Sequence, residues 1–138
     1  MKKYSTFLIL SSILFLTWTA FTPPTTNLED EDWKEKISSK LMTKALRGEA
    51  LDFLVILKNQ KNVNDAPNFK TKEARGNFVY KKLKSNAQAD QKNILQILQS
   101  EKASYRSFFI INAIQVKGDF KLLKKLAKLS KVNQLTDN

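Results

Sequence analysis

The chain has neither histidine nor cysteine among its 138 residues. These two absences exclude the Ser/His/Asp triad, the Cys/His dyad, zinc sites built from the usual ligands, haem ligation by histidine and disulfide frameworks. Only three glycines are present, so the sequence has no glycine-rich loop of the kind that cradles phosphates. We therefore expect no cofactor, no metal ion and no catalytic residue, and the composition predicts a protein that acts by binding rather than an enzyme.

Basic residues dominate the charged part of the composition. Lysine and arginine number 24 against 13 aspartates and glutamates, which gives a net charge of +11, and 42% of the residues are hydrophobic, enough for one packed domain. Only three of the basic residues are arginine, whose planar guanidinium suits the recognition of bases and phosphates, and the lysines are spread along the chain. The sequence therefore predicts a solvated basic surface and no nucleic-acid partner.

The N-terminus has the layout of a secretory signal. Residues 1–3 form a short basic region with two lysines, and the uncharged run at 4–21 is dense in leucine, isoleucine and phenylalanine. This pattern predicts a signal peptide at residues 1–20 and export to the periplasm or the outside of the cell. An uncleaved anchor is the alternative, and only then is a membrane partner expected. Residues 21–32 contain two adjacent prolines and consecutive carboxylates, which predicts a linker without the converging geometry of a metal site.

The rest of the chain predicts an α+β domain. Apolar residues at helical spacing indicate a lead helix at residues 33–48, followed by a domain at 52–138. The elements expected in this domain are a strand at 53–57 buried on both faces, a helix from Thr71 to about Ser100, strands at 104–111 and 114–117, a helix capped by Asp119, and a strand at 131–135. This β-α-β-β-α-β order is the split βαβ arrangement, in which four antiparallel strands carry two helices on one face.

The helix-free face of such a sheet is a candidate binding surface, because an exposed apolar face usually marks a partner site. Phe108 and Phe109 are adjacent in a predicted strand and therefore point to opposite faces, one into the core and the other to the open face. The lysines of the last helix are expected to be solvated, with a charged lipid surface as the alternative. These lysines are Lys121, Lys124, Lys125 and Lys128.

Several segments of the chain carry a family resemblance. The segments at residues 53–58 (FLVILK), at 105–118 with its central FFIINAIQVKG, and at 131–135 resemble strands of the propeptide (peptidase inhibitor) domain of subtilisin-like serine proteases. Residues 37–48 are similar to the segment that precedes this domain in long bacterial members. The resemblance covers residues 33–138 and includes no catalytic domain.

The resemblance implies a ferredoxin-like fold, preceded here by the lead helix, whose open sheet face packs on two surface helices of a subtilisin-like protease. In that family the domain assists folding of the protease, and its C-terminal segment lies in the active-site cleft as a product-like inhibitor. Two groups of residues are thus expected at the protease: Leu135, Thr136, Asp137 and Asn138 in the cleft, and Phe108, Phe109, Asn112 and Ala113 at the sheet face or its loop.

The same features leave other interpretations open. Residues 135–138 also fit a frayed terminus, and Asn112 and Ala113 also fit a plain connection between two strands. The whole chain fits an inhibitor, a folding helper, the remnant of a truncated propeptide, or an exported protein-binding module with no protease partner. Inhibition of a subtilisin-like protease distinguishes the first of these from the last.

Overall fold

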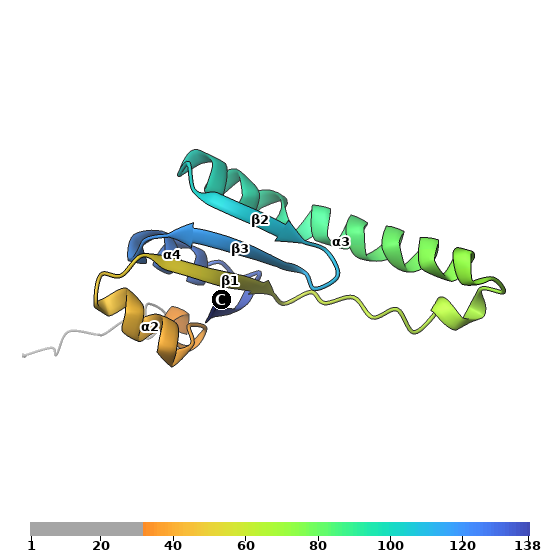
Figure 1. Cartoon of the computed structure of the whole chain (residues 1–138), viewed down its shortest axis with the longest axis horizontal. Helices are drawn as coiled ribbons and strands as arrows, with labels where there is room; N and C mark the ends of the chain where they lie inside the picture. Colours follow the sequence, from red (N-terminus) through yellow and green to blue (C-terminus); the bar gives the residue numbers. More distant parts are fainter. Residues whose placement is uncertain (1–31) are drawn as a thin grey trace, which may run out of the picture.

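The computed structural model describes residues 32–138; the predicted signal peptide at 1–20 and the predicted linker up to residue 31 lie outside these described residues. The elements follow one another along the chain as shown in Figure 1: α1 (Asp32–Glu35), α2 (Ser39–Leu46), β1 (Leu51–Leu57), the short 3-10 helix η2 (Ala66–Asn68), α3 (Lys72–Ser100), β2 (Ser104–Phe108), β3 (Ala113–Gly118), α4 (Phe120–Ala127) and β4 (Val132–Asp137).

The four strands form one antiparallel sheet in the order β2-β3-β1-β4. Val55 of β1 lies opposite Ile114 of β3 on one side and Leu135 of β4 on the other. The predicted α+β class with a four-stranded antiparallel sheet is therefore confirmed. The prediction that β1 is buried on both faces is wrong: its residues alternate between buried and half-buried, and Leu54 and Ile56 lie on the less covered face.

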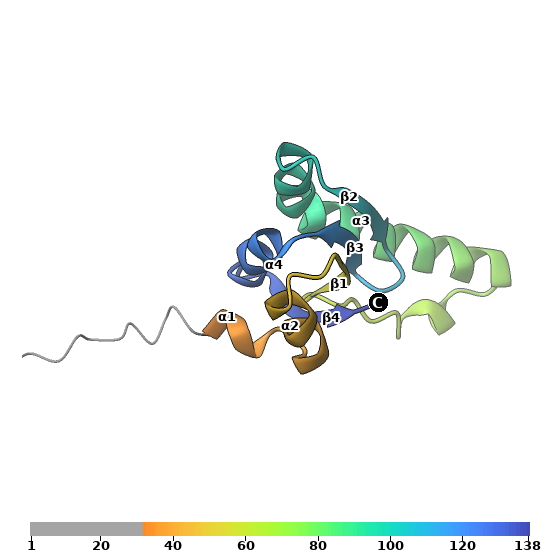
Figure 2. The same ribbon diagram turned by 60° about the vertical axis from the view of Figure 1, so that its left-hand side comes forward.

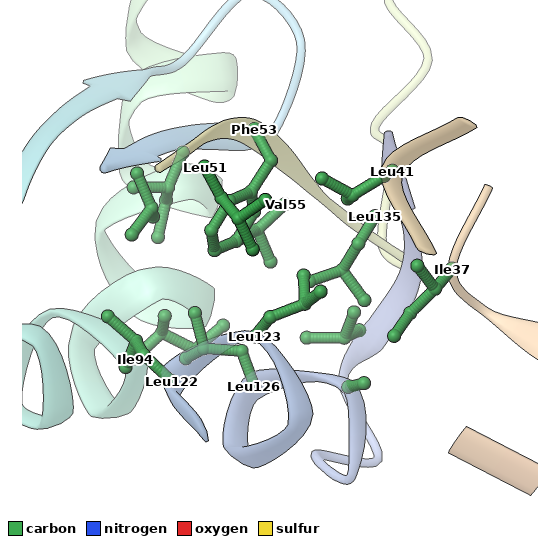
Figure 3. Packing of buried hydrophobic residues seen from close by; sticks show 14 of the residues in the cluster. Ile37, Leu41, Leu51, Phe53, Val55, Ile94, Leu122, Leu123, Leu126 and Leu135 are labelled. Atoms are coloured by element: carbon green, nitrogen blue, oxygen red, sulfur yellow. The ribbon is translucent and has the colours of Figure 1, made fainter. Parts of the chain in front are cut away.

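The core lies on one side of the sheet (Figure 3). Figure 3 shows Phe53 and Val55 of β1 pointing toward Leu123 and Leu126 of α4, and all four side chains are fully buried. The short helix α4 begins where the sequence predicts, because the carboxylate of Asp119 accepts a hydrogen bond of 2.8 Å from the backbone N–H of Leu122. Burial of these apolar side chains is the main favourable contribution to folding.

Helix α3 has the predicted extent, and only its second half belongs to the core. Thr71 caps it by accepting a hydrogen bond of 3.1 Å from the backbone N–H of Ala74. The buried residues of the helix are Ala87, Gln91, Ile94 and Leu98. Figures 1 and 2 show the first half projecting past the end of the sheet. This half therefore lies outside the core and packs instead against the preceding loop and η2; the ring centroids of Phe69 and Phe78 are 4.7 Å apart.

The predicted lead helix at 33–48 is divided into two short helices. Between them the chain runs beside β4: Leu135 donates a backbone hydrogen bond of 2.7 Å to the carbonyl of Lys36, and Ser38 donates one of 2.9 Å to the carbonyl of Leu135. Without this segment, the outer edge of β4 would have unpaired backbone groups. Residues 36–38 pair with that edge instead of forming a turn of helix. Trp33 and Ile37 are buried although they do not lie on one continuous helix, so their helical spacing was misleading.

The second strand is also shorter than predicted. It ends at Phe108 rather than at Ile111, and residues 109–112 form a turn into β3. The alternation argument therefore does not apply to Phe109, which lies outside the strand. This turn borders the candidate site.

Candidate functional site

The face of the sheet opposite the core carries a shallow apolar groove of about 490 Å³, called here the open-face groove. Strand β1 supplies Leu54 and Ile56, whose side chains point away from the core. The other residues that line the groove come from β2, the following turn, β3 and the C-terminus: Arg106, Ser107, Phe108, Phe109, Ile110, Ile111, Ala113 and Asn138.

Two adjacent isoleucines in the β2–β3 turn border this groove and are strongly exposed. Ile110 is 74% exposed and Ile111 is 60% exposed. A single exposed apolar side chain is ordinary on a protein surface, whereas a contiguous apolar patch usually marks an interaction site. The turn and the groove together form such a patch.

A buried polar network holds the turn in place. The side chain of Gln91 is 1% exposed and donates hydrogen bonds of 2.9 Å both to the carbonyl of Phe108 and to Oδ1 of Asn112. Asn112 is 2% exposed, and its own amide donates hydrogen bonds of 3.0 Å to Asp90 and to the carbonyl of Asn59. A turn tied down in this way loses little conformational freedom when a partner binds it.

The sheet-face residues predicted from the sequence separate into two roles. Phe108, Phe109 and Ala113 line the groove. Asn112 is buried behind the turn, so the structure gives it the plain role of a connection that holds the strands in place. Phe109 also meets helix α3, where its ring lies edge-on to Tyr80 with 5.5 Å between the ring centroids.

The C-terminal residues predicted for a protease cleft are mostly part of the sheet. Leu135, Thr136 and Asp137 belong to β4, and the side chain of Leu135 is fully buried. Only Asn138 follows the strand; its backbone N–H donates a hydrogen bond of 3.2 Å to the carbonyl of Asp52. The structure therefore differs from the expected extended tail.

A pair of lysines fixes the end of β4. Lys40 and Lys44 of α2 lie 2.6 Å and 2.7 Å from the carboxylate oxygens of Asp137. The hydrogen bond from Lys40, followed by that from Lys44, lowers the pKa of the Asp137 carboxyl below its usual value. This ion-paired cluster had no signal in the sequence, because 93 positions separate Lys44 from Asp137.

The opposite end of the open face is polar. Gln115 donates a hydrogen bond of 2.8 Å to Asp52, and the ammonium group of Lys117 lies 3.8 Å from the same carboxylate. The face therefore has an apolar part beside the turn and a polar part beyond it, which is the usual composition of a protein–protein contact.

Gln91 and Asp90 hold the turn beside the candidate site and were not predicted from the sequence. Polar side chains on a helix usually face solvent, so Gln91 was not expected in the core. A signal was nevertheless available, because Gln91 falls in the stripe formed by Ala87, Ile94 and Leu98 at helical spacing.

Residues 32–138 bring together no cluster of three or more acidic side chains suited to holding a metal ion. In the same range, no helix has the length and apolar character needed to cross a bilayer. No family model matches the chain, and neither a curated protein nor a solved structure is significantly similar to it. The role of the open-face groove is therefore inferred from its own geometry and chemistry, together with the resemblance carried by the sequence.

Proposed function

We propose that the protein is an exported, non-enzymatic module of the subtilase-propeptide type that binds a subtilisin-like serine protease through the open-face groove, and inhibits it or assists its folding. The observation that carries this proposal is an apolar groove on the sheet face that no helix of residues 32–138 covers, bordered by the exposed side chains of Ile110 and Ile111. The chain order β1, α3, β2, β3, α4, β4 and the strand order β2-β3-β1-β4 support a ferredoxin-like fold for the module.

The chemistry of the groove favours a helical partner surface. A shallow apolar hollow across a twisted sheet accepts the apolar stripe of a helix, and each Å² of apolar surface removed from water contributes about 25 cal/mol. The polar group formed by Asp52, Gln115 and Lys117 would lie at the rim of such a contact, where water has access. Two surface helices of a protease, as the family resemblance implies, fit this division.

The proposal assigns the main contact to the groove rather than to residues 135–138. Leu135 is part of the core, and Asp137 is held by two lysines, so placing either in a protease cleft requires β4 to separate from β1. Asn138 lies beyond the strand and borders the groove. Its side chain reaches a partner at the groove while β4 stays paired with β1.

The test is steady-state inhibition of a panel of subtilisin-like proteases by residues 21–138. An Ile111→Glu variant places a charge in the exposed apolar patch that borders the groove and is expected to raise the inhibition constant by about tenfold or more. Leu46→Glu is the matched control, because Leu46 is 71% exposed on α2 and lies outside the groove. The control is expected to inhibit as the unmodified protein does.

Three results would argue against this assignment. If the module inhibits no protease of the panel, and if no protease raises the melting temperature of the module, the protein is not a subtilase inhibitor or folding helper. If Ile111→Glu and Leu46→Glu change the inhibition constant equally, the groove is not part of the contact with the protease. Loss of inhibition on deleting Asn138 alone, with Ile111→Glu fully active, would move the contact to the C-terminus.

A further inference from the structure

Residues 58–86 form a projecting segment, called here the basic arm, that contributes no fully buried side chain. It consists of the loop after β1, the short helix η2 and the first half of α3. Figures 1 and 2 show it extending past the sheet, at the end of the molecule opposite α2. Because this long segment contributes no buried side chain to the core, we looked to its surface for a role in binding.

Positive charge is concentrated on this arm. Residues 58–84 contain eight basic and two acidic side chains, a net charge of +6, while residues 32–138 as a whole contain 22 basic and 10 acidic side chains, a net charge of +12. Half of the net charge of the described chain thus lies on 27 of its residues. One of the two acids, Asp65, is paired with Lys82 at 2.9 Å. The arm therefore presents an excess of cations to its surroundings.

An apolar hollow of about 430 Å³, called here the arm hollow, lies between the arm and the β2–β3 turn. Tyr80 at its border is 46% exposed, and Ile110 on the turn is 74% exposed. Phe109 of the turn also lines the hollow, and the first half of α3 supplies the rest of its lining: Arg75, Gly76, Val79 and Leu83. The arm thus combines apolar and aromatic surface with its positive charge.

The cations flank this apolar surface. Lys84 donates a hydrogen bond of 2.6 Å to the hydroxyl of Tyr80, and its ammonium group lies 4.9 Å from the ring centroid. Lys72 lies on the same helical face as Gly76, Val79 and Leu83, because residues three and four apart line one face. Lysine stems cover apolar surface while their charged ends extend outward, which places cations around the edge of the hollow.

We propose that the arm hollow is a peripheral docking site for an anionic lipid bilayer. Apolar and aromatic side chains surrounded by flexible lysines match the boundary between acyl chains and phosphate headgroups, where each cation near the surface contributes to binding. The site contains one arginine, Arg75, whose guanidinium donates a hydrogen bond of 3.1 Å to the carbonyl of Phe69. Recognition of bases, or of paired carboxylates on a protein, would favour several arginines instead. The contact uses none of residues 1–31.

The experiment measures partition of residues 21–138, and of the full chain, onto phosphatidylcholine vesicles with and without phosphatidylglycerol. The arm variant carries Lys72→Glu and Lys84→Glu and leaves Arg75 in place, since Arg75 holds the loop. The control variant carries Lys92→Glu and Lys121→Glu, which changes the net charge equally at exposed positions outside the arm. Thermal melts establish that both variants are folded.

We expect the unmodified protein to bind the anionic vesicles, and the arm variant to lose about tenfold or more of that partition. The control variant is expected to lose much less. If the protein does not bind anionic vesicles, or if both variants lose partition equally, the arm hollow is not a docking site for lipid. Displacement of the protein from vesicles by an oligonucleotide at low concentration would overturn it in favour of nucleic acid. Protease inhibition by the arm variant is expected to be unchanged. Vesicle partition therefore tests the lipid-docking site, and protease inhibition tests the proposed function independently.

Discussion

At the scale of single residues, the amide of Gln91 connects the core to the proposed binding surface. It donates to the carbonyl of Phe108 and to Asn112, and it accepts a hydrogen bond from the hydroxyl of Ser107. Every buried side-chain polar atom in residues 32–138 has a hydrogen-bond partner, so removing this amide leaves several buried groups unpaired.

Gln91→Ala is therefore expected to lower the free energy of unfolding by about 1–3 kcal/mol, measured by urea denaturation. Gln99→Ala on the same helix is the matched control. Gln99 is exposed and makes one hydrogen bond of 3.2 Å, to the hydroxyl of Tyr105, so its loss should change stability by less than about 0.5 kcal/mol. Similar effects of the two substitutions would show that the network contributes nothing beyond an ordinary surface contact.

The carboxyl of Asp137 makes stability depend on acid pH. Hydrogen bonds from Lys40 and Lys44 lower its pKa in the folded protein, whereas an aspartate in the unfolded chain titrates near about 3.9. The stabilisation is thus fully present above the unfolded pKa and is lost as the pH falls through the lower folded pKa. Asp137→Asn should flatten the fall in stability below about pH 4, as measured by urea denaturation from neutral to acid pH. Parallel curves for the two proteins would contradict this role.

At the scale of elements, the sequence predicted what is decided locally. Helix α4 and the long helix α3 begin directly after Asp119 and Thr71, whose capping side chains precede an apolar stripe. The break at Lys36 and the end of β2 at Phe108 are decided by partners far along the chain. The first depends on the edge of β4 and the second on the network around Gln91. No local pattern carries that information.

The candidate site divides in the same way. The apolar run that contains Phe108 and Phe109 was sufficient to identify the region of the groove, because alternation and hydrophobicity are properties of the sequence. The sequence did not predict that Ile110 and Ile111 are exposed, because both were assigned to a strand that in fact ends before them. The burial of Asn112 likewise depends on Gln91, which lies 21 positions away.

At the scale of the whole molecule, the segment that contains α1 and α2 is part of the domain rather than an addition to it. Ile37 and Leu41 are buried against the same core as Leu135, as Figure 3 shows. The ring of Trp33 lies 6.2 Å from that of Phe120, between centroids. The backbone of residues 36–38 also covers the outer edge of β4, which would otherwise be open to pairing with another chain.

A version of the protein that starts at Glu49 is therefore expected to lose cooperative unfolding, whereas one that starts at Thr22 retains it. Four buried side chains are removed with the segment: Trp33, Ile37, Leu41 and Ala45. Full burial of each large apolar side chain contributes about 1.5–3 kcal/mol, so their sum is comparable to the roughly 5–15 kcal/mol that stabilises a typical domain. Thermal melts followed by circular dichroism, with size-exclusion chromatography to detect association through the exposed edge of β4, provide the measurement. A monomer that starts at Glu49 and melts cooperatively would show that the sheet and helices α3 and α4 form a complete domain by themselves.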